Sequence, residues 1–142
     1  MLRSFLNKWL SQRSVPSNRG AQGEHYAERY LVKYGKMRLI ARNWRNPRDR
    51  REEIDLVMRD GEVLVFVEVK TRSAGALVPG YHAVDARKKR VLSRGIRAYL
   101  RGMKEPPRTH RFDVVEVAWP KATDAGEPKV RHLANVSLAR SS

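Results

Sequence analysis

The stretch EIDLVMRDGEVLVFVEVK, residues 53–70, contains the pattern that decides the fold. Two runs typical of β-strands, residues 53–59 and 62–70, flank the dipeptide Asp60-Gly61. Asp-Gly between such runs is the strongest short-range sign of a β-hairpin with a two-residue turn. We therefore predict an antiparallel hairpin, and the length of its turn fixes which residues face one another.

The predicted register gathers charged side chains on one face of this hairpin. With Asp60-Gly61 as the turn, Asp55 lies opposite Phe66 and Glu53 lies opposite Glu68. Because side chains alternate between the two faces of a strand, these acids and Lys70 project from the same side. Asp55 and Glu68 then become diagonal neighbours, roughly 7–8 Å apart. Both carboxylates could reach one hard cation, with a lysine beside it.

The same face also carries apolar residues, which makes an ordinary solvated surface a poor explanation. Val57, Leu64 and Phe66 share it, while the other face is expected to carry Ile54, Leu56, Met58, Val63, Val65 and Val67. A sheet that is apolar on both sides is covered on both sides, and half-buried carboxylates need a cation or a proton. Two readings remain open beside this one. The acids could sit at a wet strand end where Lys70 neutralises Glu68, or a β-bulge near Asp55 could shift the register.

Composition directs attention to polyanionic partners. The chain has 142 residues, a formal net charge of +15 and no cysteine. A basic domain of this size most often meets nucleic acid, and less often an anionic membrane or the ribosome. The missing cysteines exclude a disulfide framework and a thiolate metal site, and they suit the cytoplasm. No apolar run is long enough to insert stably in a membrane.

The order of expected elements predicts a mixed α/β fold. We expect residues 1–19 to form an extension that is partly helical or flexible, and residues 20–142 to form one domain with a central mixed sheet flanked by helices. The expected helices cover residues 20–34 and 84–100. The expected strands beyond the hairpin cover residues 37–44, 111–119 and 129–139. The expected loops cover residues 46–51, 71–79 and 120–128.

Both expected helices carry residues that suggest a function. In the first, the apolar stripe is Ala27, Tyr30, Leu31 and Tyr34, and Glu24 borders it. The second has a row of arginines: Arg87, Arg90, Arg94, Arg97 and Arg101. This row is either a solvated surface or a ridge that binds phosphates, since few acids are present to pair with it. Lys88 interrupts the apolar stripe of that helix and either reaches the edge or points toward the acidic cluster and a phosphate.

Two further residue types receive structural interpretations. Asp113 could approach the acidic cluster from its strand, but we favour a structural role for it. Trp9, Trp44 and Trp119 are interpreted as packing residues rather than as platforms for nucleic-acid bases.

An ordered set of motifs resembles the YraN-like family of small, largely uncharacterised bacterial proteins. The resemblance runs from about residue 20 to residue 139. The family usually has glycine where this chain has Glu52, a difference that we expect to affect only a turn. The motifs are Gly23-Glu24-x-x-Ala27, Tyr30-Leu31, Ala41-Arg42-Asn43-Trp44-Arg45, Glu53-Ile54-Asp55-Leu56-Val57, Val65-Phe66-Val67-Glu68-Val69-Lys70-Thr71-Arg72, Val84 with Lys88, Arg111-Phe112-Asp113-Val114-Val115 and His132-Leu133-x-Asn135.

This family in turn resembles the restriction-endonuclease-like superfamily, whose PD-(D/E)xK nuclease core is similar to that of archaeal Holliday-junction resolvases. The resemblance implies a restriction-endonuclease-like fold and a site at four matched positions: Glu24, Asp55, Glu68 and Lys70. Ile54 stands where the superfamily motif often has proline. The resemblance also makes the carbonyl of Val69 a candidate metal ligand, and it leaves a homodimer open because junction-cutting relatives commonly pair.

We expect metal-assisted hydrolysis of phosphodiester bonds. Asp55 and Glu68 would bind Mg²⁺ or Mn²⁺, Lys70 would orient the attacking water, and Glu24 would hold a water or a second ion. Lys88 and Arg72 would hold the scissile phosphate. Arg87 and Arg94, with the other ridge arginines and the basic residues 45–51, would supply affinity for the backbone, of DNA more than RNA. The alternative is a non-catalytic nucleic-acid-binding or accessory module on a nuclease-like fold.

Overall fold

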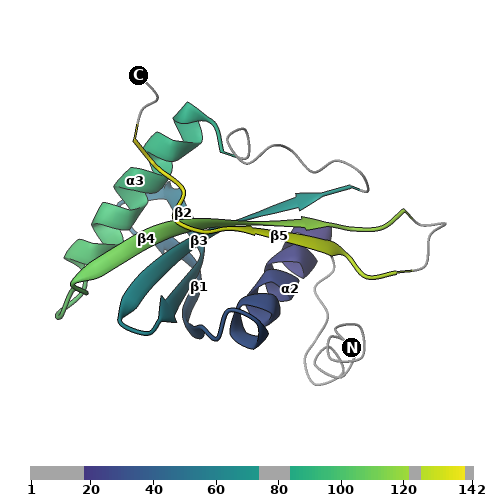
Figure 1. The fold of residues 1–142 in the computed structure, drawn as a ribbon. Coiled ribbons are helices and arrows are strands. Elements are labelled where there is room, and N and C mark those ends of the chain that lie inside the picture. The colour runs from purple at the N-terminus through teal and green to yellow at the C-terminus, as the bar shows by residue number, and fades with distance from the viewer. Residues whose placement is uncertain (1–17, 74–83, 122–125, 140–142) are drawn as a thin grey trace.

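Five strands form one mixed sheet, and one helix packs on each of its faces (Figure 1). The computed structural model describes residues 18–73, 84–121 and 126–139. The sheet order is β1-β2-β3-β4-β5; β3 and β4 run parallel, and all other neighbours run antiparallel. The elements are α2 (Arg19–Lys33), β1 (Arg38–Asn46), β2 (Asp49–Asp60), β3 (Val63–Arg72), α3 (Ala86–Arg101), β4 (Thr109–Ala118) and β5 (Lys129–Leu133).

The observed order of elements confirms the predicted α/β architecture. A helix, three strands, a helix and two strands follow one another as expected, and this order is consistent with a restriction-endonuclease-like fold. Thr71 and Arg72 were expected in a loop but extend β3, because each pairs with β4. Residues 74–79 of that predicted loop, the extension up to residue 17 and residues 122–125 lie outside the described residues.

Each helix begins at a side chain that caps it. The side-chain oxygen of Asn18 accepts a hydrogen bond from the N–H of Ala21 at 2.7 Å, and that of Asp85 accepts one from Lys88 at 2.8 Å. Such caps satisfy backbone donors that have no partner within the helix. They set the starts of α2 and α3 within two residues of the predicted starts. None of the helices in the described ranges is long and apolar enough to span a membrane.

The hairpin formed by β2 and β3 is present, but its predicted register is wrong by two residues. Asp60 pairs with Val63 and Val57 pairs with Phe66, so the two turn residues are Gly61 and Glu62. Gly61 has a φ of +58°, which is the glycine-favoured conformation at the first central position of a type II′ turn. A shift of two residues preserves the face of every side chain. It brings Asp55 level with Glu68 rather than with Phe66.

A second correction concerns the predicted basic loop at residues 46–51. β1 and β2 are joined by a tight turn, and Asn46 pairs directly with Asp49. The Asn46 side chain accepts a hydrogen bond from the N–H of Arg48 at 3.0 Å. Asn-Pro is a turn-forming dipeptide, and asparagine often bonds the backbone two residues on. The charge of this segment had suggested a loop, whereas its turn chemistry allows β2 to begin at Asp49.

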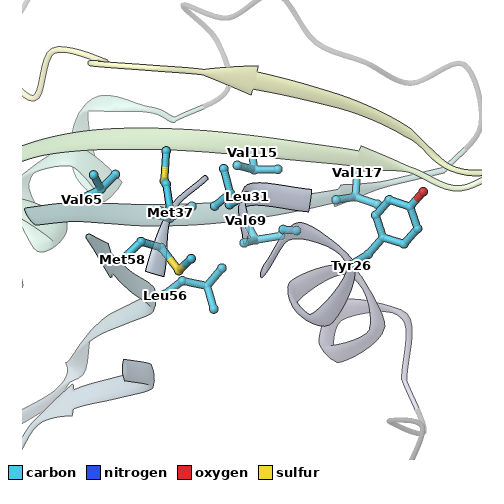
Figure 2. Close-up of a cluster of buried hydrophobic side chains, with 11 residues drawn as sticks. Tyr26, Leu31, Met37, Leu56, Met58, Val65, Val69, Val115 and Val117 are labelled. Carbon is cyan, nitrogen blue, oxygen red and sulfur yellow. The ribbon is translucent and has the colours of Figure 1, made fainter. Parts of the chain in front are cut away.

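The cluster between the sheet and α2 forms one half of the core. Tyr26 and Leu31 of α2 belong to one buried cluster with Leu56 and Met58 of β2 and Val65 of β3, and Figure 2 shows the Tyr26 ring at the end of this cluster where Val117 of β4 lies. Two details of the predicted helical stripe change. Tyr26 is buried although it was not expected to be, and Tyr34, placed in the stripe, is 49% exposed. Tyr34 is the C-cap, so the chain leaves the helix there, and its ring contacts that of Tyr30.

The other half of the core lies between the sheet and α3, and it reveals a change of faces in β1 and β2. Ile54 and Trp44, which pair, both belong to this cluster, whereas Leu56 belongs to the α2 cluster. Grouping Ile54 with Leu56 on one face was therefore wrong. The residue between Trp44 and Arg42 is Asn43, whose φ of 49° twists the strand pair. The twist lies opposite Asp55.

Candidate functional site

Strands β2 and β3 separate at the point where the two acids stand. Their pairing ends at Leu56 and Val67, while β2 continues along β1 and β3 continues along β4. Beyond that point the N–H of Val69 donates to Oδ2 of Asp55 at 2.8 Å. The Asp55 side chain therefore takes the place of a backbone partner. This holds the carboxyl group beside Glu68 in a gap between two strands.

Glu68 is the centre of the charged cluster. It is 4% exposed, and its Oε1 lies 3.4 Å from Nζ of Lys70 and 3.5 Å from Nζ of Lys88. Its other oxygen, Oε2, is buried and has no hydrogen-bond partner among the residues that the structure describes. A buried acceptor without a partner is costly. Asp55 is also buried, so these acids do not occupy a wet strand end, although Lys70 does pair with Glu68.

The second helix supplies Lys88 because its first turn faces the strand gap. Lys88 follows the cap residue Asp85 by three positions, and its half-buried side chain points toward Glu68 rather than to the edge. The sequence allowed two orientations of the Lys88 side chain, and the structure has the one that points toward the acids. The cluster thus joins side chains from β2, β3 and α3.

Two acids of the cluster, Asp55 and Glu24, have a raised pKa. Burial, and then the charge of Glu68, raises the pKa of Asp55 to about 8. Burial also raises the pKa of Glu24, with the charges of Glu53 and Glu68 adding to the effect. Glu24, on α2, is therefore part of the same electrostatic cluster. A set of desolvated like charges favours a bound cation or proton.

The donor set fits a magnesium-type ion through two carboxylates. Within the described residues no group of three or more acids or histidines is close enough to hold a metal together. Mg²⁺ is commonly held by only one or two carboxylates, with waters and substrate phosphate completing its shell. The unpartnered Oε2 of Glu68 and the adjacent carboxyl of Asp55 meet that requirement. Val69, between Glu68 and Lys70, has its N–H engaged by Asp55.

A basic cleft of about 580 Å³ begins at Lys88. Arg87, Arg90 and Arg94 of α3 are exposed and line it together with Arg51 of β2. The predicted arginine row and the basic segment before the hairpin therefore meet in one surface. Arg94 is also engaged on its inner side, where its Nε lies 3.6 Å from Oε2 of Glu52.

Arg72 lies elsewhere. The described ion pairs of Glu68 are those with Lys70 and Lys88. Arg72, expected beside Lys88 at the scissile phosphate, instead lines a separate cavity with Arg19, Trp119 and Lys121. The expectation of one phosphate grip formed by Lys88 and Arg72 is therefore not met.

Among the described residues, Glu28 of α2 is a buried acid outside the cluster that accepts from Arg42 of β1, and three further buried acids outside the cluster also have structural partners. Asp113 is fully buried and binds Arg111, His132 and the N–H of Asn135, so the favoured structural role agrees with its contacts. Glu116 is fully buried and accepts from Arg131 at 2.8 Å.

The third acid, Glu52, was expected in a turn. It stands in β2, nearly buried, and accepts from the side chain of Asn46 at 3.0 Å. The sequence offered no signal for the burial of Glu52 and Glu116. Their partners come from other elements, so only the tertiary fold reveals them.

Comparison with known proteins places most of the chain in one group. The model of the uncharacterised protein family UPF0102 matches residues 23–117, which include the whole acidic cluster. A UPF0102 protein of Chlorobium phaeobacteroides (strain BS1) is 36% identical over 126 residues, covering 87% of this chain and 97% of the relative. One from Solibacter usitatus is 44% identical over 108 residues, covering 76% and 80%. One from Beutenbergia cavernae is 44% identical over 117 residues, covering 82% and 93%.

Proposed function

The chain belongs to the uncharacterised protein family UPF0102, the YraN-like family that its motifs resemble, and we propose that it is a metal-dependent nuclease. The reaction proposed is hydrolysis of phosphodiester bonds in nucleic acid, in branched or structured DNA more than in RNA. One observation carries the proposal. Two buried carboxylates, Asp55 and Glu68, stand side by side in a strand gap, one oxygen of Glu68 has no partner within the described ranges, and two lysines flank it.

Each residue of the cluster has a distinct task in this proposal. Asp55 and Glu68 would hold Mg²⁺ or Mn²⁺, with the carbonyl of Val69 as a further oxygen ligand. When bound, the ion would supply acidification of water and neutralisation of charge on the phosphate. Lys70 would orient the attacking water. Glu24 would hold a water or a second ion, because it is half-buried and close enough to Glu53 and Glu68 for their charges to add to the effect of burial on its pKa.

Lys88 would receive the scissile phosphate. Its ammonium lies 3.5 Å from Glu68, so a phosphate oxygen that it holds would lie at the acidic cluster. The basic cleft that starts at Lys88 supports a route for the rest of the backbone, because its exposed lining includes four arginines and one acid. Phosphate contacts of this kind position a nucleic acid without reading its sequence.

The alternative function is a nucleic-acid-binding module without catalysis. One observation favours it: Lys70 and Lys88 already provide two positive charges to Glu68, so the cluster could be balanced without a metal. Both functions require the basic cleft. They differ only in whether hydrolysis occurs.

A nuclease panel distinguishes the two functions. Labelled junctions, flaps, duplexes, single strands and RNA are incubated with Mg²⁺, with Mn²⁺ or with chelator. We expect wild type to cut at least one DNA substrate, and Asp55→Asn, Glu68→Gln and Lys70→Met to lose about a hundredfold or more of the rate while still binding DNA. Glu62→Gln, an exposed acid in the turn of the same hairpin, and Lys104→Met, an exposed lysine, serve as matched controls. Cutting that persists in the cluster variants would refute the site, and intact substrates throughout would favour the binding module.

A further inference from the structure

A second cavity, of about 640 Å³, lies at the carboxyl ends of β3 and β4. Arg19 of α2, Arg72 of β3 and the exposed Lys121 contribute positive charge to its lining, and none of the described residues that line it is an acid. The remaining lining residues are Thr71, Ser73, Trp119 and Pro120. The cavity therefore offers donors and cations together with an aromatic wall. A volume within about 300–1,000 Å³ is typical of sites for small ligands.

The aromatic wall is held firmly in place. The Trp119 ring packs edge-on against Tyr26 of the core, with ring centroids 5.9 Å apart, and the Arg19 guanidinium lies 4.8 Å above it. The backbone N–H of Trp119 donates to the backbone carbonyl of Arg72 at 3.1 Å, which links the two lining residues. Arginine planes and aromatic faces are the surfaces on which unpaired bases stack.

Two donors at this wall have no acceptor in the described chain. They are Nε of Arg72 and Nε1 of Trp119, both buried. An unpaired buried donor is unfavourable, so a ligand that brings acceptors would be favoured here. A phosphate group offers several acceptor oxygens and a negative charge, and guanidinium groups match its geometry.

The cavity adjoins the acidic cluster through one tight contact. Thr71 lines the cavity and touches Gly23 so closely that a Cβ on Gly23 would lie 2.2 Å from the threonine oxygen. The chain neighbours of these two residues are Lys70 and Glu24, both in the cluster. Among the described lining residues, none is shared between the basic cleft at Lys88 and this cavity. One basic recess therefore lies beside the acidic cluster at α2, and another lies beside it at α3.

We propose that this second cavity binds one unpaired nucleotide next to the scissile phosphate. Arg72 and Lys121 hold the phosphate of that nucleotide, and its base stacks on the Arg19–Trp119 pair. A base within a duplex cannot enter a recess without leaving its stack, so the cavity selects single-stranded extensions or unpaired junction nucleotides. This substrate preference rests on the proposed nuclease function.

The test measures binding without hydrolysis. Anisotropy titrations in chelator compare a blunt duplex with the same duplex carrying a single-stranded extension. We expect wild type to prefer the extended DNA, and the double variant Arg72→Gln/Lys121→Gln to lose about fivefold or more of its affinity for it, while blunt-duplex affinity changes less than about twofold. Lys104→Gln, an exposed lysine outside the cavity, should leave the preference unchanged. Equal losses on both DNAs, or no loss, would overturn the proposal.

Fluorescence provides an independent readout. Quenching of tryptophan emission by the extension should fall in Trp119→Phe and persist in Trp44→Phe, whose ring packs against Tyr99 instead. Quenching that is unchanged in Trp119→Phe would count against stacking. The outcomes also separate the two proposals. A preference lost in the variants without any cleavage by wild type retains the cavity and removes the nuclease, whereas Asp55-dependent cleavage with no effect of the cavity variants does the reverse.

Discussion

At the scale of single residues, burial and the charge of Glu68 disfavour the ionised form of Asp55 when no metal is bound. Its pKa is raised to about 8, first by burial and then by Glu68. An unfolded aspartate releases its proton near pH 4, so between about pH 4 and pH 8 the folded state keeps a proton that the unfolded state would lose. The contribution of Asp55 to stability therefore falls as pH rises through this window.

Asp55→Asn should remove the loss of stability that accompanies the rise in pH. Asparagine keeps an oxygen for the Val69 N–H but carries no charge. We predict that in chelator the variant unfolds at a higher temperature than wild type near pH 8, by on the order of 3–5 °C, and that the difference shrinks toward pH 4. Thermal melts across this pH range measure it. Parallel curves for the two proteins would contradict the account, and Glu62→Gln should follow wild type.

The acidic cluster could be predicted from the sequence because side chains alternate between the two faces of a strand. Alternation placed Asp55, Glu68 and Lys70 on one side, and an error of two residues in the register did not change that. The sequence could not show whether Lys88 contacts Glu68, because the direction of the Lys88 side chain depends on how α3 crosses the sheet. Arg72 was misplaced for a similar reason. It stands only two residues beyond Lys70, yet it lines a different recess at the strand end.

At the scale of elements, each helix places a glycine against the sheet, and the two glycines differ in the space available for an added Cβ. A Cβ on Gly23 of α2 would meet the Thr71 oxygen at 2.2 Å, whereas a Cβ on Gly95 of α3 would meet Glu52 at an ordinary 3.6 Å. We predict that Gly23→Ala destabilises the protein by about 1–3 kcal/mol through overpacking. Gly95→Ala should stabilise it by about 0.5–1 kcal/mol, since alanine favours the helix.

Denaturant unfolding of both variants measures these effects. Thr71→Ala in the Gly23→Ala background removes the clashing oxygen and should recover much of the lost stability. Equal effects of the two glycine substitutions would show that α2 does not approach β3 as closely as described.

A buried ion network joins β4 to β5 and the segment after it. Burial alone would raise the pKa of Asp113, but hydrogen bonds from His132, Arg111 and the Asn135 N–H hold it below its ordinary value. A lowered pKa means that Asp113 stabilises the fold above about pH 4 and that this contribution disappears as pH falls further.

Asp113→Asn should therefore cost roughly 3 kcal/mol at pH 7, because Arg111 loses a buried carboxylate partner. The melting curves of variant and wild type should converge below about pH 3. Asp49→Asn, which breaks an exposed pair with Arg51, should show a much smaller effect at every pH. A gap that persists undiminished at low pH would contradict this assignment.

Which elements form could be predicted from pattern, but several of their boundaries could not. The hairpin, both helices and the mixed sheet followed from alternation and apolar stripes. The change of faces at Asn43 and Asp55 could not be foreseen, because a left-handed asparagine has no distinct mark in the sequence. The turn at Asn46 carried a signal, the Asn-Pro dipeptide, that the surrounding arginines outweighed.

At the scale of the whole molecule, the chain has a net charge of +15, and part of its positive charge lines the basic cleft. The basic cleft on α3 holds Arg87 and Arg90 at exposed positions. Each phosphate contact contributes about 0.9 to the slope of log affinity against log salt. We predict that Arg87→Ala/Arg90→Ala reduces that slope by about 2 for duplex DNA, measured by anisotropy over a range of salt. Lys104→Ala should leave it unchanged, and an unaltered slope in the double variant would place the DNA elsewhere.

In the proposed site, Asp55 and Glu68 together bind one divalent ion. Calorimetric titration of the metal-free protein with Mn²⁺ tests it most directly, with Asp55→Asn, Glu68→Gln and Glu62→Gln measured alongside. The account predicts one saturable site in wild type and in Glu62→Gln, and at least a tenfold weaker site in either cluster variant. Binding of equal strength in all four proteins, or no binding in any of them, would contradict it.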